Sequence, residues 1–486
     1  MLLFLTLLTA DPAFAGGADV GGYFRVMGRP DFQGGSGRLG FWNLHGRLLN
    51  EGPYGMLELR YDVLEPTPGG TQPWTALHAR VEGGSIGNAS ASNGSLADFR
   101  LSQVFVKTGN VALKDVTWQV GTLEYFFGDL GLYDMRPATV FFDTVGVSAR
   151  YESDVVEVLL GAGDSGFNIH GLDYNPVPTA GGTVRVRAGR HLELGTGGEA
   201  LFEGKRLGNT NAPYHTPGIT YEDWVRGEVT ETFIADFPGL EDSFPNPRAR
   251  SSKSWKVVGY LGFGGLGPIQ WNNFFVNYRK LHPETTTTEQ LAGQTVDIYV
   301  HDFSDQRFEL NLGNELQLKL VPDRLDAVWG VLYGDHRDAD NDLVPSDHDR
   351  KYASTVLRLQ AYATPTVHFL VESSLARERS SNGNAYREHA DSIFANTGGN
   401  PTSRGLEVGD TDTRYTWQGK GGIVLNPLGT GIYTRPSLRL LYGTQYSNVN
   451  NAFGNNFVEA LDQFNDFEAV EQHWHHLLAA EAEVWF

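Results

Sequence analysis

The last residues of the chain alternate between two kinds of side chain with a period of two. One parity is wholly apolar and comprises Leu478, Ala480, Ala482, Val484 and Phe486. The other parity carries Glu481, Glu483 and Trp485. Because successive side chains of an extended strand point to opposite sides, this segment predicts a strand with one apolar and one polar face. A soluble antiparallel sheet with one wet face shows the same pattern.

The same alternation recurs along the chain. In residues 56–63, Leu57 and Leu59 share a face with Tyr61, opposite Glu58 and Arg60. Similar segments are 183–187, 191–194, 308–312, 316–320 and 437–440. Turn chemistry at 321–324 and 364–366 predicts short hairpins, whereas the polar stretches 65–98, 208–253, 335–350 and 379–413 predict long loops. Together with an aromatic carboxy-terminus, these features favour an all-β transmembrane antiparallel β-barrel, with lipid outside and water inside.

The ends and the composition agree with a membrane barrel. Residues 2–10 are mostly apolar and precede Ala13, Phe14 and Ala15, so we expect a signal peptide over 1–15, although the usual basic start is missing. Residues 16–486 are then expected to form a single domain. The chain has no cysteine, and no apolar run beyond residue 15 is long enough for a transmembrane helix. A net charge of −20 argues against a nucleic-acid partner.

Three motifs are better explained by structure than by chemistry. The glycines of 262–267 have dinucleotide-loop spacing, but a strand-like segment follows instead of a helix, so a hairpin turn is favoured. The acidic stretch 335–349 could supply oxygen ligands for Ca²⁺, but it lacks the bidentate Glu of a calcium loop, so a solvated loop is favoured. His473, His475 and His476 are expected at the start of the last strand. We find no catalytic signature and expect no enzyme, no metal and no cofactor.

Aromatic and basic residues share the parity that is expected to face inward. Tyr23 and Arg25 share one face, Arg38 and Trp42 share another, and Tyr433 shares a third with the basic residues Arg435 and Arg439. Sugar rings have apolar faces and hydroxyl rims, so aromatic platforms beside charged groups suit carbohydrate. Equally, inward aromatic residues can pack against loops folded into the lumen. Parity alone leaves both interpretations open.

At these residues the chain resembles the maltoporin family of carbohydrate porins. Residues 22–25 are similar to the family's opening strand, 38–40 to its second strand, and 98–100 to the segment after the second loop. Gly121, Tyr125, Asp129 and Asp134 match the approach to the constriction loop, and 431–436 with 485–486 match the last strands. The resemblance implies an 18-stranded barrel, a homotrimer and passive sugar uptake along an aromatic path.

The resemblance also assigns residues. It places Tyr23, Trp271, Tyr433 and Trp485 on the aromatic path, and parity adds Trp42. It places Arg25, Arg38, Arg100 and Asp134 on the polar track. Two departures lie at the constriction, where Phe127 stands in place of an arginine and Arg136 in place of a tyrosine. Trp74 falls in the loop that reaches a neighbouring subunit in the family.

We therefore expect a channel in the bacterial outer membrane for facilitated diffusion of carbohydrates, either maltodextrin-like or other oligosaccharides. Its partners would be the sugar solute and outer-membrane lipid. The alternative is a general or anion-preferring diffusion porin, steered by the arginines of the polar track. A third class comprises an outer-membrane hydrolase or a secreted soluble β-protein.

Overall fold

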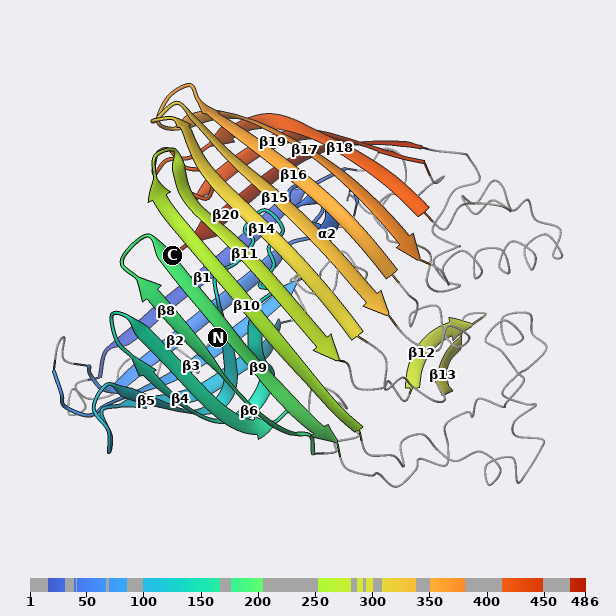
Figure 1. Ribbon diagram of the computed structural model, residues 1–486. Helices are drawn as coiled ribbons and strands as arrows, with labels where there is room; N and C mark the ends of the chain where they lie inside the picture. Colours follow the sequence, from blue (N-terminus) through green and yellow to red (C-terminus); the bar gives the residue numbers. More distant parts are fainter. Residues whose placement is uncertain are drawn as a thin grey trace, which may run out of the picture.

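The computed structural model describes residues 16–30, 39–40, 42–66, 70–84, 99–166, 176–203, 252–280, 286–291, 294–299, 308–337, 350–380, 413–448 and 473–486. Within these residues, eighteen strands form one antiparallel sheet (Figure 1). Their bounds are β1 Ala18–Gly28, β2 Tyr54–Leu64, β3 Trp74–Gly84, β4 Phe99–Gly109, β5 Val116–Phe126, β6 Thr139–Glu152, β7 Val156–Asp164, β8 Pro178–Ala188, β9 Leu192–Glu203, β10 Ser252–Leu266, β11 Ile269–Lys280, β14 Phe308–Val321, β15 Leu325–Arg337, β16 Arg350–Tyr362, β17 Val367–Ser380, β18 Thr413–Leu425, β19 Ser437–Ser447 and β20 Trp474–Trp485.

The sheet closes on itself because β1 pairs with both β2 and β20, with Tyr23 opposite Trp485 in the latter register. Every other strand pairs with its neighbours in sequence, apart from the hairpin formed by β12 Thr286–Leu291 and β13 Gln294–Tyr299, which stands apart from the barrel. Closure leaves no unpaired sheet edge, which is what a strand-built membrane protein requires. The predicted antiparallel barrel of about 18 strands is confirmed.

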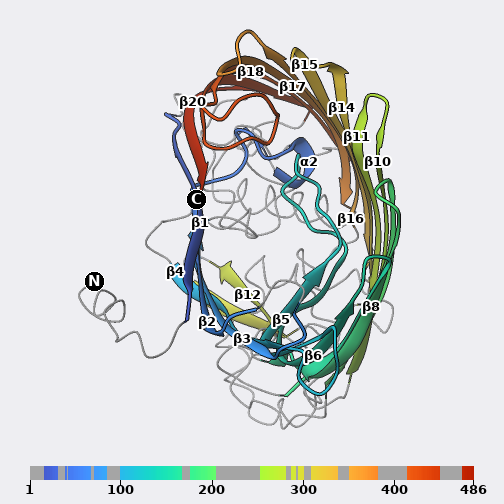
Figure 2. The same cartoon turned by 90° about the vertical axis from the view of Figure 1, so that its left-hand side faces the viewer.

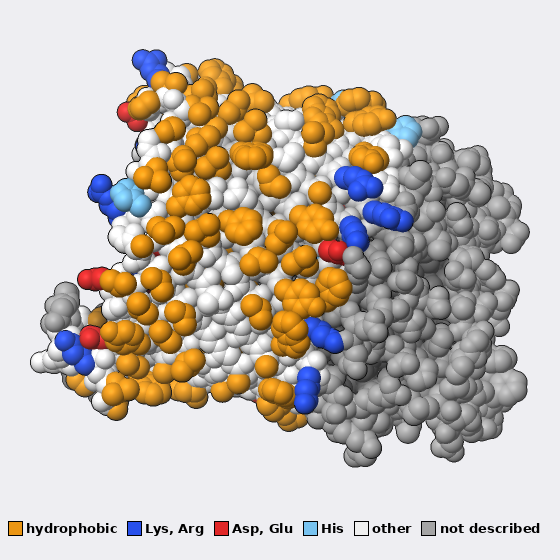
Figure 3. Space-filling model, viewed as in Figure 1, with side chains coloured by type: hydrophobic (Ala, Val, Ile, Leu, Met, Phe, Trp, Pro, Cys, Tyr) orange, Lys and Arg blue, Asp and Glu red, His pale blue; other side chains and the backbone are white. Residues whose placement is uncertain are grey.

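Burial along the strands is the reverse of that in a soluble protein. On β17, Phe369 and Val371 are exposed, whereas Glu372 and Glu378 are buried. On β19, Leu438 and Leu440 are exposed and Arg439 is buried, as the alternation predicts. Figure 3 shows apolar side chains spread over the outer wall, with charged ones gathered near its two ends. An apolar outer band around a polar interior places the protein in the bacterial outer membrane.

The connections alternate between short and long around the barrel. Strands β10 and β11 are separated by residues 267–268 and β14 and β15 by 322–324, whereas β9 ends at Glu203 and β10 begins at Ser252. The short connections share one rim, which also carries the carboxy-terminus (Figure 1). Short turns face the periplasm in outer-membrane barrels, so the long connections lie on the extracellular side.

One predicted loop is wrong, because the stretch 65–98 contains strand β3. Its inward parity carries His78 and Arg80, and its outward parity carries Leu77 and Ala79. Because the outward face is only weakly apolar, the sequence pattern predicts a polar loop here. Trp74 is the first residue of β3 instead of a loop residue that reaches a neighbouring subunit. The predicted loop 335–350 is shorter than expected, since β15 continues to Arg337.

Two segments assigned to strands are connections. The second strand is Tyr54–Leu64, whereas Leu39 and Gly40 precede the short helix α2, Trp42–His45, in the connection between β1 and β2. Residues 431–436 likewise precede β19. By contrast, the glycines of 262–267 end β10 at a hairpin, and His475 and His476 lie in β20, as predicted.

Some expectations fall partly or wholly outside the described residues. The segment 1–15 and most of the acidic stretch 335–349 do so. Within the described residues there is no cluster of three or more potential metal ligands from His, Asp or Glu. None of the helices described there is both long and apolar enough to span a membrane.

Candidate functional site

Three connections fold into the barrel and fill part of its interior. They are residues 39–51 with helix α2, residues 127–138 between β5 and β6, and residues 426–436 before β19. Figure 2 shows α2 and the 127–138 connection inside the ring of strands, on the side of β14–β18. The main apolar core therefore lies between these inward connections and the inner wall, instead of between two layers of secondary structure.

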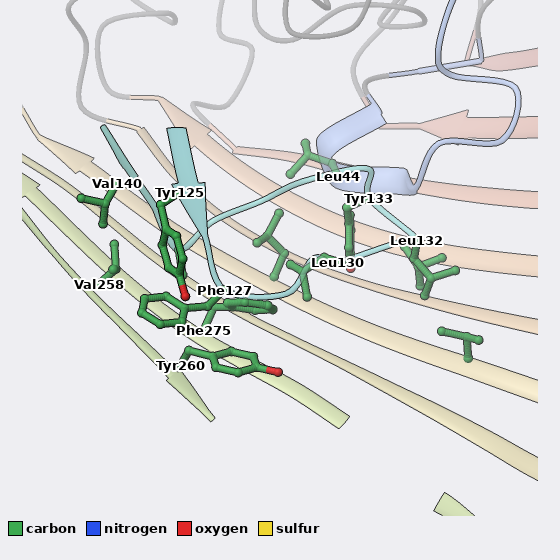
Figure 4. Packing of buried hydrophobic residues seen from close by; sticks show 14 of the residues in the cluster. Leu44, Tyr125, Phe127, Leu130, Leu132, Tyr133, Val140, Val258, Tyr260 and Phe275 are labelled. Atoms are coloured by element: carbon green, nitrogen blue, oxygen red, sulfur yellow. The ribbon is translucent and has the colours of Figure 1, made fainter. Parts of the chain in front are cut away.

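Residues 127–138 present apolar side chains to the wall. Phe127, Leu130, Leu132 and Tyr133 have no exposed surface. Figure 4 shows Phe127 beside Tyr260 and Phe275, with Leu130, Leu132 and Tyr133 further along the same connection. Glycines on the inner wall leave room for these side chains, because a side chain at the same positions would collide with them. A Cβ added to Gly195 would lie 2.5 Å from the Phe127 ring, one on Gly313 would lie 2.7 Å from Leu130, and one on Gly330 would lie 2.7 Å from the Tyr133 ring.

Polar side chains of the wall hold the backbone of the same connection. Asn273 Nδ2 donates to the Asp129 carbonyl at 2.9 Å, and Asn277 Nδ2 donates to the Pro137 carbonyl at 2.8 Å. The Leu132 amide donates to Glu315 at 2.8 Å. These bonds satisfy backbone groups that would otherwise be buried without partners. The 127–138 connection is consequently an integral part of the inner wall.

Residues 39–51 cover a second area of the wall. Leu39 and Leu49 pack against an inward apolar patch of β17–β20 that includes Leu441 and Leu477. Lys420 Nζ donates to the His45 carbonyl at 2.8 Å, and the Arg47 amide donates to the Leu132 carbonyl at 2.8 Å, which links the two inward connections. Burial, together with the nearby Lys420, lowers the pKa of His45 to about 3. We therefore expect His45 to remain neutral at physiological pH.

A buried ionic network lies beneath these connections. Glu372 accepts from Arg358 Nε at 2.7 Å and from Lys420 Nζ at 2.7 Å, with all three side chains at most 1% exposed. Glu483 pairs with Arg435 at 2.6 Å and with Arg47 at 2.6 Å. Inward charges on this side of the barrel are therefore paired with opposite charges and shielded from the lumen.

The opening strand contributes to the same network. Tyr23, only 4% exposed, donates to Glu483 at 2.5 Å. Arg25, 2% exposed, pairs with Glu51 and lies 3.7 Å from Asp134. Burial raises the pKa of Glu51 to about 8. Burial would also raise the pKa of Asp134, but Arg47 and Arg25 hold that pKa below its ordinary value. The structure thus brings Tyr23, Arg25 and Asp134 together, and it buries Tyr23 and Arg25.

The remaining predicted residues are scattered. Phe127 is fully buried against Tyr260, so its assignment to the constriction surface is wrong. Arg136 lies over the Phe126 ring at 4.1 Å and 3.4 Å from Glu124. Arg38, and the side chains of Trp42 and Arg100, lie outside the described residues.

The aromatic residues do not form one open path within the described part of the chain. Tyr433 donates to Glu315 at 2.8 Å and faces Gly131 of the inward connection. Half-buried Trp271 donates to Asn273 at 2.6 Å. Trp485 has inward parity and is 56% exposed at the short-turn rim, with its ring 4.5 Å from that of Tyr23. For Tyr23 and Tyr433, packing inside the barrel describes the side chain better than a sugar platform does.

The larger of two interior cavities among the described residues lies along the inner wall of β1–β5. A cavity of about 470 Å³ is lined there by polar and aromatic side chains, with three cations and three carboxylates among them: Asp19, Glu58, Arg60, His78, Arg80, Gln103, Phe105, Lys107, Gln119, Glu124 and Phe126. The rings of His78 and Phe105 stack at 4.7 Å, and Lys107 Nζ lies 4.9 Å from the Phe105 centroid. We call this surface the β1–β5 wall.

Ion pairs order the β1–β5 wall without removing it from water. Arg80 Nε donates to Glu58 at 2.7 Å and its Nη1 lies 3.7 Å from Glu124. Arg60 pairs with Asp62 at 2.8 Å. The sequence pattern identifies only Glu58 and Arg60 of this surface, because it predicts a loop over residues 74–84. Recognising the alternation of His78, Arg80 and Glu82 would have revealed it.

Comparisons with known proteins add the following. No family model matches the chain, and no curated protein matches it. Among solved structures, OccK3 (OpdO) of Pseudomonas aeruginosa is 9% identical, with a TM-score of 0.40, over 100% of this chain and 99% of that one. An anion-selective porin of Comamonas acidovorans is 11% identical, with a TM-score of 0.38, over 97% and 100%. Wzi of Escherichia coli, a carbohydrate-binding β-barrel, is 11% identical, with a TM-score of 0.39, over 96% and 85%. Likeness at this level identifies no family and carries no argument about function.

Proposed function

We propose that the protein is a diffusion channel of the outer membrane, and that solutes cross it along the β1–β5 wall. The observation that carries this proposal is the division of the interior. Residues 39–51 and 127–138 cover much of the wall of β14–β20, where a cavity of about 360 Å³ remains beside Gln317 and Asp326, whereas the β1–β5 wall borders a larger cavity of about 470 Å³. A polar, water-filled interior between such walls conducts small hydrophilic solutes. The proposal involves no covalent chemistry.

We further propose that neutral, hydroxyl-rich solutes such as small carbohydrates are the preferred class. Phe105 offers an apolar ring face, and Gln103 and Gln119 beside it offer amide donors and acceptors. Aromatic faces and charge-assisted hydrogen bonds suit sugar rings. One such stack contributes on the order of 1 kcal/mol, which is weak enough for a solute to leave. Exposed Trp485 is a candidate first contact at the periplasmic mouth.

Charge balance favours a neutral solute over an anion. The β1–β5 wall carries three cations, Arg60, Arg80 and Lys107, and three carboxylates, Asp19, Glu58 and Glu124. Steering of anions requires an excess of positive potential along the path. We therefore expect weak ion selectivity and place the anion-preferring porin second. The homotrimer remains a proposal that rests on the resemblance to maltoporins.

The test is single-channel current in planar bilayers, titrated with a panel of neutral oligosaccharides. Phe105→Ala should weaken sugar block by roughly fivefold, as expected for the loss of about 1 kcal/mol. Phe369→Ala, which removes the same ring from the exposed outer face of β17, is the matched control and should leave block unchanged. Equal block in Phe105→Ala and wild type would refute the sugar-binding role, and strong anion preference without sugar block would favour the rival.

A further inference from the structure

Basic side chains form a row on the outer surface at the extracellular rim. They occupy the loop-side ends of four strands and comprise Lys253, Lys280, Lys351, Arg377 and Arg379. Each shares the outward parity of its strand, as Arg377 does with exposed Leu375. Figure 3 shows Lys and Arg side chains at this border of the apolar wall. These cations therefore lie where the outer leaflet's head groups meet the protein.

The row is densest on β16 and β17. Lys351 stands directly opposite Arg379 across the two strands, and Arg377 lies one outward position further along β17. Like charges that face each other across a sheet are destabilising. Asp335 on β15 offsets one of the three cations, with an oxygen 3.3 Å from Lys351 Nζ. Among the described outward side chains of β15–β17, three cations lie beside this one carboxylate, a charge pattern that favours an anionic ligand.

An apolar groove of about 470 Å³ lies directly below this patch on the outer wall. Outward-facing Ala353 and Thr355 leave space between bulkier neighbours, and Leu375 and Trp417 flank it. Arg377 stands at its loop-side end, where its Nε donates to the Tyr415 hydroxyl at 3.2 Å. The groove thus has an apolar surface, and the guanidinium group of Arg377 lies at its loop-side end.

Aromatic side chains place the groove at the membrane interface. Trp417 and Trp474 have ring centroids 6.2 Å apart, and Tyr446 lies 5.0 Å from Trp474. Such belts mark the head-group level of outer-membrane barrels. The apolar groove therefore extends to the acyl-chain region, and the cations of β16 and β17 lie at the level of the phosphates.

We propose that this groove and patch form a binding site for a phosphorylated, acylated glycolipid of the outer leaflet. An acyl chain lies between Leu375 and Trp417, and a phosphate contacts Lys351, Arg377 and Arg379. Clusters of Lys and Arg at the membrane surface attract anionic head groups in this manner. A second copy related by a two-fold axis is a poorer occupant, because that contact would bring two positive patches together.

The test measures binding of lipid A to the detergent-solubilised full chain by native mass spectrometry. Lys351→Gln combined with Arg379→Gln should weaken binding of bisphosphorylated lipid A by about tenfold to thirtyfold, since each basic residue near a membrane contributes about 1 kcal/mol. Lys253→Gln combined with Lys280→Gln removes the same charge from the same rim, away from the groove, and should change affinity less than threefold. Equal losses in the two double variants would overturn the site.

Two further arms separate the phosphate from the acyl chain. Ala353→Phe fills the groove on an exposed strand position and should also weaken lipid A binding, while the barrel stays folded. Dephosphorylated lipid A should bind the wild type about as weakly as intact lipid A binds the charge variant. If dephosphorylated lipid binds equally well, or if Ala353→Phe only changes the oligomeric state in lipid-free detergent, the lipid site is wrong.

Discussion

Glu372→Gln is expected to destabilise the barrel by about 3–5 kcal/mol, the cost of leaving buried charges without their partner. Glu372 pairs with both Arg358 and Lys420, and all three side chains are almost fully buried. Lys420 also holds the His45 carbonyl, so the loss of Glu372 should loosen residues 39–51 as well. Equilibrium urea unfolding in lipid vesicles, followed by tryptophan fluorescence, measures the change.

Two variants show whether burial is the cause. Glu58→Gln removes a carboxylate of the same kind, but its side chain is 48% exposed beside Arg80, so the cost should stay below about 1 kcal/mol. Replacing Glu372, Arg358 and Lys420 together by Met should recover most of the stability, because an apolar cluster leaves no buried charge uncompensated. An equal, small cost for Glu372→Gln and Glu58→Gln would contradict the buried network.

Gly330→Leu is expected to detach residues 127–138 from the wall and to interrupt the channel current. The new Cβ would lie 2.7 Å from the Tyr133 ring and 3.1 Å from Leu132, both of which are fully buried. Overpacking of this kind costs about 1–3 kcal/mol, and moving the connection relieves it. A connection released from the wall reaches across the passage, so single-channel recordings should show transient partial closures that the wild type lacks.

Gly421→Leu is the matched control for this change. Gly421 lies on the outward parity of β18, and the nearest atom to an added Cβ is the Leu370 carbonyl oxygen at 3.6 Å. The leucine should enter lipid without strain and leave the recordings unchanged. A current without partial closures in Gly330→Leu, or the same closures in Gly421→Leu, would show that Gly330 does not hold residues 127–138 against the wall.

The barrel could be predicted from the sequence because the alternation of side chains is local. Residues 56–63 and the last strand each have one apolar and one charged face, and the structure places the apolar one outward. The pattern does not predict strand β3, because its outward parity includes Ala79 and its inward parity is strongly polar. Strand parity does not apply to residues 38–42, because helix α2 begins at Trp42.

The candidate site was less predictable, because coverage depends on contacts distant in sequence. Parity identified Tyr23 and Arg25 as inward, but not that Glu483 and residues 39–51 would bury them. The sequence position of Phe127 suggests a residue that lines the lumen. In the structure its ring instead packs against Gly195 and stacks on Tyr260. Inward charges on β16–β20 and on β1–β5 look alike in the sequence, and only the inward connections distinguish covered charges from open ones.

The most direct measurement compares two inward glutamines in this cysteine-free chain. Gln103 borders the cavity of the β1–β5 wall, whereas Gln445 is 1% exposed beneath residues 39–51. A hydrophilic thiol reagent should label Gln103→Cys in intact membranes and reduce the single-channel current, and it should label Gln445→Cys only after unfolding. Rapid labelling of Gln445→Cys in the folded barrel, or an unchanged current after Gln103→Cys is modified, would contradict passage along β1–β5.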